Sequence, residues 1–117
     1  GIISIVLSKE LREPIITATD ISHEALITAK NNADKHNIND INFVESNWFD
    51  SIKNEKFDLI ISNPPYVDKS KLSNKELFGI DMEPDIALYS KNNGTSDLEI
   101  IIKNVDFLLK KINFTKL

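Results

Sequence analysis

Residues 57–66 read Phe-Asp-Leu-Ile-Ile-Ser-Asn-Pro-Pro-Tyr. The stretch begins with an apolar run and ends with Asn-Pro-Pro-Tyr. The Leu-Ile-Ile centre of this run is typical of a strand covered on both faces, and it predicts a β-strand over residues 57–62. Each proline fixes its φ angle and lacks an N–H donor, so the strand should end abruptly at residues 63–66. Open α/β sheets bind ligands at the carboxyl ends of their strands. The stretch therefore predicts a buried strand with a candidate site at its end.

The segments on either side of this strand alternate between helical and strand patterns. Helices are expected over residues 2–12, from an N-cap at Ser22 to about residue 36, and over residues 98–111, with strands over residues 15–19 and 41–45. A polar loop is expected over residues 67–96, with a short helix near residues 72–78. This order is typical of an α/β domain with a mostly parallel sheet flanked by helices, here one domain over residues 1–117.

The composition excludes several classes of protein. The chain has 117 residues, of which 41% are apolar and 27% charged, and its formal net charge is −4. It has no cysteine, which excludes disulfide scaffolds and thiolate metal sites, and no His, Asp and Glu cluster has metal-ligand spacing. No run is long enough to span a membrane and no signal peptide is visible, so we expect a cytoplasmic protein. The acidic balance disfavours direct binding to nucleic acid.

The tetrapeptide Asn63-Pro64-Pro65-Tyr66 has the chemistry to hold an uncharged NH2 group. The stiff turn presents carbonyl acceptors, and the Asn63 side chain adds one more acceptor and an amide donor. Tyr66 adds an aromatic wall. Such a pocket can orient a weakly nucleophilic nitrogen towards an electrophile without a charged base. The alternative is a Pro-Pro turn that does no more than end a strand.

Two further candidates follow the predicted strands 15–19 and 41–45. Asp20 ends the first, where an acid commonly binds the ribose hydroxyls of a nucleotide-like cofactor, although it could instead be a turn or capping residue. Asn47-Trp48-Phe49 follows the second. The aromatic pair Trp48-Phe49 could form a wall against an adenine and Asn47 could bond to its edge, or the pair could belong to the core. Residues 82–88 could be a lid, or a turn into a short edge strand.

Together these segments resemble the peptide chain release factor glutamine methyltransferases over nearly the whole chain. The resemblance rests on Asn63-Pro64-Pro65-Tyr66, on Ala18-Thr19-Asp20-Ile21-Ser22, on Asn47-Trp48-Phe49 and on Glu83-Pro84-x-x-Ala87-Leu88. The tetrapeptide alone is shared with enzymes that methylate amino groups of adenine in DNA or guanine in RNA. The Glu-Pro-x-x-Ala-Leu segment makes the release-factor branch more specific.

The resemblance implies a partial Rossmann-like, S-adenosylmethionine-dependent methyltransferase domain. The implied reaction transfers the cofactor methyl group to the side-chain amide nitrogen of the glutamine in the Gly-Gly-Gln loop of class 1 translation release factors, by a monomeric enzyme. The implied cofactor-binding residues are Gly1, Asp20, Asn47, Trp48 and Asn63. The implied catalytic residues are Asn63, Pro64, Pro65 and Tyr66, which with Glu83 also bind the substrate. Asn47 stands where the family often has an acid, but its carbonyl can still accept a hydrogen bond.

The family also has an N-terminal helical domain, a first strand with most of a glycine-rich loop, and C-terminal strands that these 117 residues lack. We therefore expect residues 1–117 by themselves to be inactive and to bind the cofactor weakly, which isothermal titration would contradict by showing micromolar affinity. A nucleic-acid amino-methyltransferase and a truncated remnant without catalytic activity are the alternatives.

Overall fold

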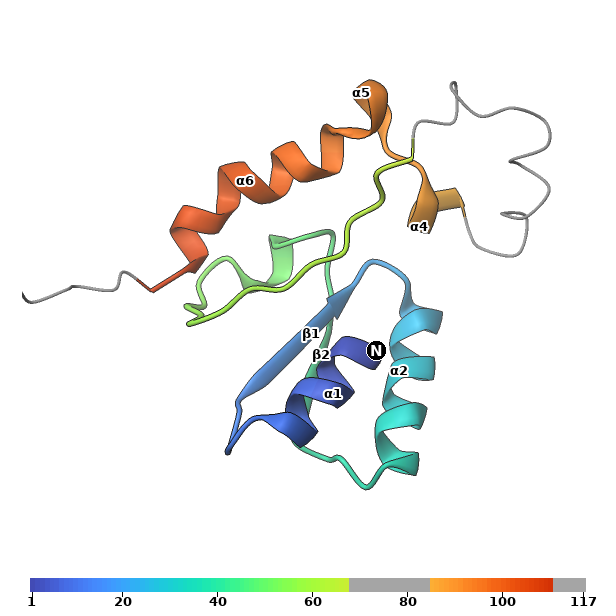
Figure 1. The fold of residues 1–117 in the computed structure, drawn as a ribbon, viewed down its shortest axis with the longest axis vertical. Helices are drawn as coiled ribbons and strands as arrows, with labels where there is room; N and C mark the ends of the chain where they lie inside the picture. The colour runs from blue at the N-terminus through green and yellow to red at the C-terminus, as the bar shows by residue number, and fades with distance from the viewer. Residues whose placement is uncertain (68–84, 111–117) are drawn as a thin grey trace, which may run out of the picture. The chain divides into compact units, whose positions relative to one another are not determined.

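The computed structural model describes residues 1–67 and 85–110, and the chain divides into two compact units, residues 1–53 and 54–117. Elements of the first unit are α1 (Ile2–Glu10), β1 (Ile16–Asp20), α2 (His23–Lys35), β2 (Ile41–Glu45) and the 3-10 helix η1 (Asp50–Ile52). Elements of the second are α4 (Asp85–Leu88), α5 (Lys91–Gly94) and α6 (Ser96–Leu108) (Figure 1). The short helix expected near residues 72–78 lies outside the described residues.

The first unit is built around a parallel pair of strands joined by a helix. β1 and β2 pair from Ile16 opposite Ile41 to Asp20 opposite Glu45, so their carboxyl ends lie at the same edge. A parallel pair needs a crossover connection, and α2 supplies it. The expected strands and the parallel α/β class are therefore confirmed, each boundary within one residue of its expected position.

The core of this unit lies where both helices pack against one face of the strands. Its buried residues are Ile5 of α1, Ala33 of α2, Ile38 and Ile41. Ile16, Ala18 and Phe43 pack against them from the two strands. Ile16 and Ala18 are two residues apart, as are Ile41 and Phe43, because successive strand side chains point to opposite faces. Alanine at position 33, only 1% exposed, leaves room for close helix packing.

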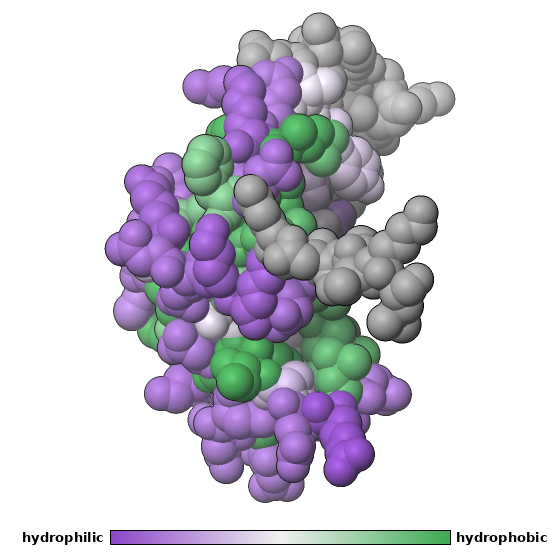
Figure 2. All heavy atoms as spheres, turned by 90° about the vertical axis from the view of Figure 1, so that its left-hand side faces the viewer, coloured by the Kyte–Doolittle hydropathy of each residue, from purple (hydrophilic) through white to green (hydrophobic). Residues whose placement is uncertain are grey.

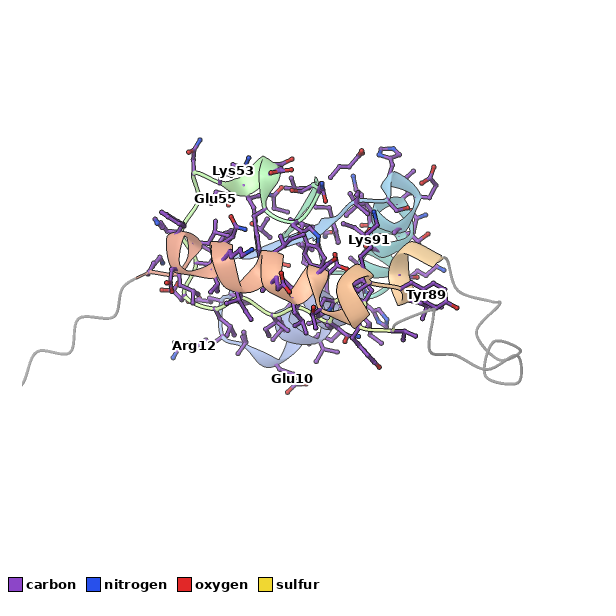
Figure 3. All side chains as sticks on the ribbon, turned by 90° about the horizontal axis from the view of Figure 1, so that it is seen from above. Glu10, Arg12, Lys53, Glu55, Tyr89 and Lys91 are labelled. Atoms are coloured by element: carbon purple, nitrogen blue, oxygen red, sulfur yellow. The ribbon has the colours of Figure 1, made fainter. Side chains whose placement is uncertain are left out.

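Helix α1 ends two residues before its expected end. Leu11 has extended backbone angles (φ −95°, ψ 149°), and its N–H still donates to the carbonyl of Leu7. Pro14 disfavours helical angles in the residue before it, and Glu13 has a φ of 52°. The side chains of Glu10 and Arg12 point away from the ribbon at this end (Figure 3). The helix therefore stops before the proline rather than at it.

Helix α2 begins at the expected N-cap and ends close to the expected residue 36. The Ser22 hydroxyl accepts a hydrogen bond from the Ala25 N–H at 3.2 Å, which satisfies one of the free donors of the first turn. At the other end, Asn37 has a φ of 57°, and the N–H groups of Asn37 and Ile38 bond to the carbonyls of Asp34 and Ala33. This is a Schellman ending with asparagine in the left-handed position.

Replacing Ser22 with alanine should loosen the first turn of α2. A lost N-cap costs about 1 kcal/mol, so amide exchange in that turn should accelerate about fivefold. Hydrogen exchange followed by mass spectrometry measures this. Thr28→Ala is the control, because the Thr28 hydroxyl bonds to the Glu24 carbonyl within the same helix and caps nothing. Equal protection in wild type and Ser22→Ala would show that the cap contributes little.

The strand predicted over residues 57–62 is wrong for this structure. Phe57 forms an isolated parallel bridge to Leu109, and residues 58–66 have no regular secondary structure. A strand is stable only when neighbouring backbone pairs with it, and within the described residues no strand pairs with residues 58–66. Leu59 and Ile61 are 61% and 48% exposed, so the covering that a buried strand needs is missing there. The sequence shows an apolar run here, but the run does not pair with a neighbouring strand as predicted.

In the second unit, the end of α6 and the residues after it are bonded to the start of this extended segment. The Phe57 N–H donates to the Leu108 carbonyl and the Lys110 N–H donates to the Phe57 carbonyl, each at 2.8 Å. Lys110 also pairs with Asp58 at 2.8 Å. Leu108 is 2% exposed, and Ile101 and Val105 are half-buried, so these residues form the inward face of this helix.

Several apolar side chains reach the surface of both units. On α1 they include Ile2 and Val6, and on α6 they include Ile102 and Phe107, each at least half exposed. Figure 2 shows such hydrophobic surface lying among hydrophilic side chains. None of the helices within the described ranges is both long and apolar enough to cross a membrane.

Candidate functional site

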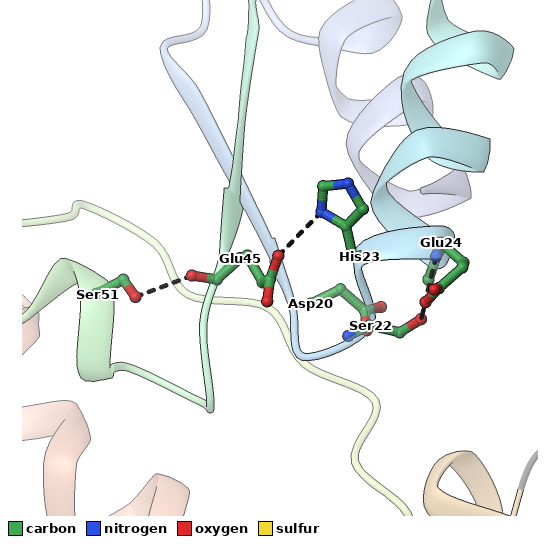
Figure 4. Close-up of polar contacts among 7 residues, drawn as sticks. Asp20, Ser22, His23, Glu24, Glu45 and Ser51 are labelled. Carbon is green, nitrogen blue, oxygen red and sulfur yellow. Dashed lines mark hydrogen bonds and ion pairs between the residues drawn. The ribbon is translucent and has the colours of Figure 1, made fainter.

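The carboxyl ends of β1 and β2 bring together the candidates of the first unit. Asp20 is the last residue of β1 and lies opposite Glu45, the last residue of β2. Ser22 and His23 follow Asp20 at the start of α2, and the turn 46–49 follows Glu45 (Figure 4). This is the edge at which a parallel sheet is expected to bind a ligand.

Asp20 is exposed, with one of its two carboxylate oxygens already bonded. Its Oδ1 accepts a hydrogen bond from the Ser22 N–H at 2.9 Å, which fixes the carboxylate at the start of α2. Within residues 1–67 and 85–110, no bond occupies Oδ2. Asp20 therefore does act as a turn residue. Its carboxylate also remains an oriented, charged acceptor at the end of the strand. Such an acceptor suits a pair of hydroxyl groups.

Charged side chains surround this carboxylate on the α2 side. The His23 imidazole Nδ1 lies 3.0 Å from the Glu45 carboxylate, with both side chains largely exposed (Figure 4). Glu24 lies in the first turn of α2, where its own backbone N–H and then the Ser22 hydroxyl lower the pKa of its carboxyl. A carboxylate is favoured there by the positive end of the helix dipole. The edge thus carries several acceptors beside one imidazole.

Trp48 lies in a tight turn directly after β2. Its φ is 53°, a left-handed conformation rare for a bulky residue, and its side chain is half-buried. Ser46 holds this turn, because its hydroxyl donates to the Trp48 carbonyl at 3.0 Å and its N–H donates to the Asp20 carbonyl at 2.9 Å. Asn47 is exposed between them. Trp48 is therefore not a fully buried core aromatic, and its turn is bonded directly to Asp20.

Gly1 packs against α2 rather than bonding to the strand-end residues of the described chain. It precedes α1, and a Cβ added to it would come within 2.8 Å of the Ala29 Cβ on α2. A glycine is needed here for close helix packing rather than for a turn. Within the part of the chain that the structure describes, no hydrogen bond joins Gly1 to Asp20 or Trp48. The expected cofactor role of Gly1 stays a prediction.

The tetrapeptide 63–66 lines a shallow pocket within the second unit. The pocket has a volume of about 270 Å³. It is lined by Asn63, Pro64, Pro65, Tyr66, Val67, Ala87 and Leu88. Asn63 and Tyr66 are exposed, Tyr66 to 68%, while both prolines are half-buried. Its lining is amide, aromatic and aliphatic, with no carboxylate, imidazole or ammonium group among these residues.

Backbone hydrogen bonds hold the two walls of this pocket together. The Val67 N–H donates to the Leu88 carbonyl and the Ser90 N–H donates to the Val67 carbonyl, both at 3.1 Å. Residues 85–88 form a helical turn rather than the edge strand that was one of the alternatives. Glu83, the expected substrate-binding acid, lies outside the described residues.

Sequence reasoning overlooked the contributions of Ser46 and Val67. Ser46 stands next to Asn47 and is 5% exposed, and a small polar residue directly after a strand was the available signal. Val67 directly follows the tetrapeptide, and no sequence signal predicts its pairing with residues 88–90.

Comparison with known proteins shows the family to which the chain is similar. Residues 1–78 match the family model described as the methyltransferase small domain. The chain belongs to this family. The edge that carries Asp20 and Trp48, together with the turn 63–66, thus lies within the matched methyltransferase region.

Curated relatives are similar over most of the chain. A bifunctional methyltransferase of Rickettsia bellii is 44% identical over 112 residues, which is 95% of this chain and 20% of that protein. A release factor glutamine methyltransferase of Francisella tularensis is 39% identical over 103 residues, 87% of this chain and 36% of that protein. A ribosomal protein uL3 glutamine methyltransferase of the same organism is 38% identical over 107 residues, 91% of this chain and 34% of that protein. The chain thus spans only a minor part of each relative.

Proposed function

We propose that this methyltransferase segment serves methyl transfer from S-adenosylmethionine to the side-chain amide nitrogen of a glutamine. The proposed substrate is the Gly-Gly-Gln loop of a class 1 translation release factor. The observation that carries this proposal is the pocket lined by Asn63, Pro64, Pro65 and Tyr66. Relatives named as glutamine methyltransferases at 38% and 39% identity support the same substrate chemistry.

The lining of the pocket suits a carboxamide better than a charged group. A glutamine side chain ends in a planar, neutral amide with two N–H donors and one carbonyl acceptor. The Asn63 side chain can bond to both kinds of group, and the carbonyls of the proline turn can accept the N–H donors. Tyr66, Ala87 and Leu88 offer apolar surface for the planar face of the glutamine amide and for its aliphatic stem. We propose Asn63, Pro64, Pro65 and Tyr66 as the catalytic residues, with Glu83 assisting substrate binding.

The edge of β1 and β2 suits the nucleoside of the proposed cofactor. S-adenosylmethionine, when bound, supplies a methyl group carried on a positively charged sulfur. The Oδ2 of Asp20, which no described residue bonds, can accept the ribose hydroxyl hydrogens, and the Trp48 indole can cover the adenine, with Asn47 bonding to its edge. We propose these residues, with Gly1 and Asn63, as the cofactor-binding set. Positioning of the amide supplies the main advantage in such a transfer, and the amide nitrogen loses one proton to water as it gains the methyl group.

A substrate comparison tests the proposal. The whole protein, including any residues beyond these 117, is incubated with methyl-labelled S-adenosylmethionine and, separately, with a class 1 release factor, ribosomal protein uL3, DNA and RNA. We expect label on the glutamine of the Gly-Gly-Gln loop, and none there when that glutamine is changed to alanine. Label on uL3 alone would redirect the proposal to the second glutamine substrate. Label on nucleic acid would contradict the proposed reaction, and no label on any substrate would favour a remnant without activity.

We further propose that the protein acts as a monomer in the cytoplasm. The reaction serves translation, and its substrate is a protein rather than a membrane or a nucleic acid. Sedimentation of the whole protein at working concentration tests the monomer directly. A stable dimer would contradict it.

A further inference from the structure

We infer that Ser46 is a positioning residue for the nucleoside of the cofactor, an inference that rests on the proposed function. Ser46 directly follows β2 and is only 5% exposed. It stands between the two residues proposed to contact the nucleoside, Asp20 and Trp48. Its own side chain is not inferred to contact the ribose or the adenine, because both hydrogen bonds of its hydroxyl are to backbone groups.

The backbone of Ser46 fixes the end of β1. The Ser46 N–H donates to the Asp20 carbonyl at 2.9 Å, one residue beyond the paired Asp20 and Glu45. This bond extends the parallel ladder to the last residue of β1. The backbone of Asp20 therefore cannot move independently of the turn that carries Trp48.

The hydroxyl of Ser46 fixes the turn itself. It donates its proton to the Trp48 carbonyl at 3.0 Å and accepts the Ser51 N–H at 3.1 Å. Trp48 has a φ of 53°, and a bulky residue keeps such a conformation only when its surroundings hold it. One buried hydroxyl thus links the left-handed residue to the start of η1. The Ser51 hydroxyl adds a bond to the Glu45 carbonyl at 2.9 Å, as Figure 4 shows.

Removing this hydroxyl should affect cofactor binding and leave the chemistry intact. Ser46→Ala leaves the Trp48 carbonyl and the Ser51 N–H without their shared partner. The turn can then relax from its left-handed conformation, and the indole loses its fixed orientation relative to the Asp20 carboxylate. Asn63 and its pocket belong to the other unit and keep their contacts. The expected pattern is a raised KM for S-adenosylmethionine with an unchanged kcat at saturation.

The test measures binding as well as turnover in the whole protein. Isothermal titration with S-adenosylmethionine, and separately with adenosine, should give affinities about tenfold weaker for Ser46→Ala than for wild type. Adenosine matters because it carries only the part of the cofactor that this turn is inferred to orient. Ser46→Cys keeps nearly the same size and a weak hydrogen-bonding group, so it should fold and bind with intermediate affinity.

Ser8→Ala is the control. Ser8 is half-buried on α1 in the same unit, and its hydroxyl donates to the Asp40 carboxylate at 3.2 Å, at the opposite end of the strands. This variant should bind S-adenosylmethionine within about twofold of wild type, since it leaves the turn 46–51 intact. Wild-type affinity in both Ser46 variants, or an equal loss in Ser8→Ala, would overturn the inference. A wild-type protein that binds no S-adenosylmethionine would overturn the proposed function as well.

Discussion

Replacing Asn63 with alanine should lower the kcat of methyl transfer by about 100- to 1000-fold. Among the described lining residues, Asn63 contributes the single side-chain amide of the pocket that also contains Pro64, Pro65 and Tyr66. Alanine keeps the stiff turn but removes the donor and acceptor that would orient the glutamine amide. The loss should appear mainly in kcat, because affinity for the substrate protein arises over a larger surface than this pocket.

The measurement is steady-state methylation of a release factor by the whole protein. Asn104→Ala is the control, since the exposed Asn104 amide donates to the Ile100 carbonyl within α6, at 2.7 Å. It removes the same chemical group from the same unit and should leave kcat within about twofold of wild type. A kcat for Asn63→Ala close to that of wild type would mean that the amide does not orient the substrate.

Replacing Asp20 with asparagine should weaken binding of S-adenosylmethionine by roughly 10- to 100-fold. Asparagine keeps an oxygen that can accept the Ser22 N–H, so the start of α2 should survive. It lacks the second carboxylate oxygen and the charge, which are the features proposed to accept the ribose hydroxyls. The variant therefore separates the cofactor role of Asp20 from its role in the turn.

Titration of the whole protein with S-adenosylmethionine measures this change. Asp40→Asn is the matched control, because Asp40 is exposed before β2 and its Oδ1 accepts the Ser8 hydroxyl at 3.2 Å, at the opposite end of the strands. Its affinity should equal that of wild type. If Asp20→Asn also binds as tightly as wild type, the ribose contact lies elsewhere.

The elements predicted well from the sequence are those with local signals. Ser22 caps α2 through a bond to a residue three positions away, and β1 and β2 show their apolar side chains at alternate positions. Residues 57–62 carry an equally strong apolar signal, yet they form no strand. Their pattern reports which residues avoid water, but strand formation also depends on a neighbour with which the backbone can pair. The residues of the segment do not indicate whether such a neighbouring strand is present.

The candidate site shows the same division between local and distant contacts. Asp20 and the tetrapeptide 63–66 were recognisable because their side-chain chemistry and strand-end positions point to ligands. Ser46 was not, because its importance comes from two backbone partners brought together by a left-handed turn. Sequence spacing suggests which side chains could do chemistry, whereas the residues that hold them in place appear only when the chain is folded.

The proposed orientation of the glutamine amide by Asn63 is tested most directly by observing that amide. A release factor labelled with nitrogen-15 on the side-chain amide of its Gly-Gly-Gln glutamine is titrated with the whole protein, and the NH2 resonances are recorded. We expect a large shift of both N–H signals with wild type and a much smaller shift with Asn63→Ala at equal saturation. Identical shifts with the two proteins would contradict it.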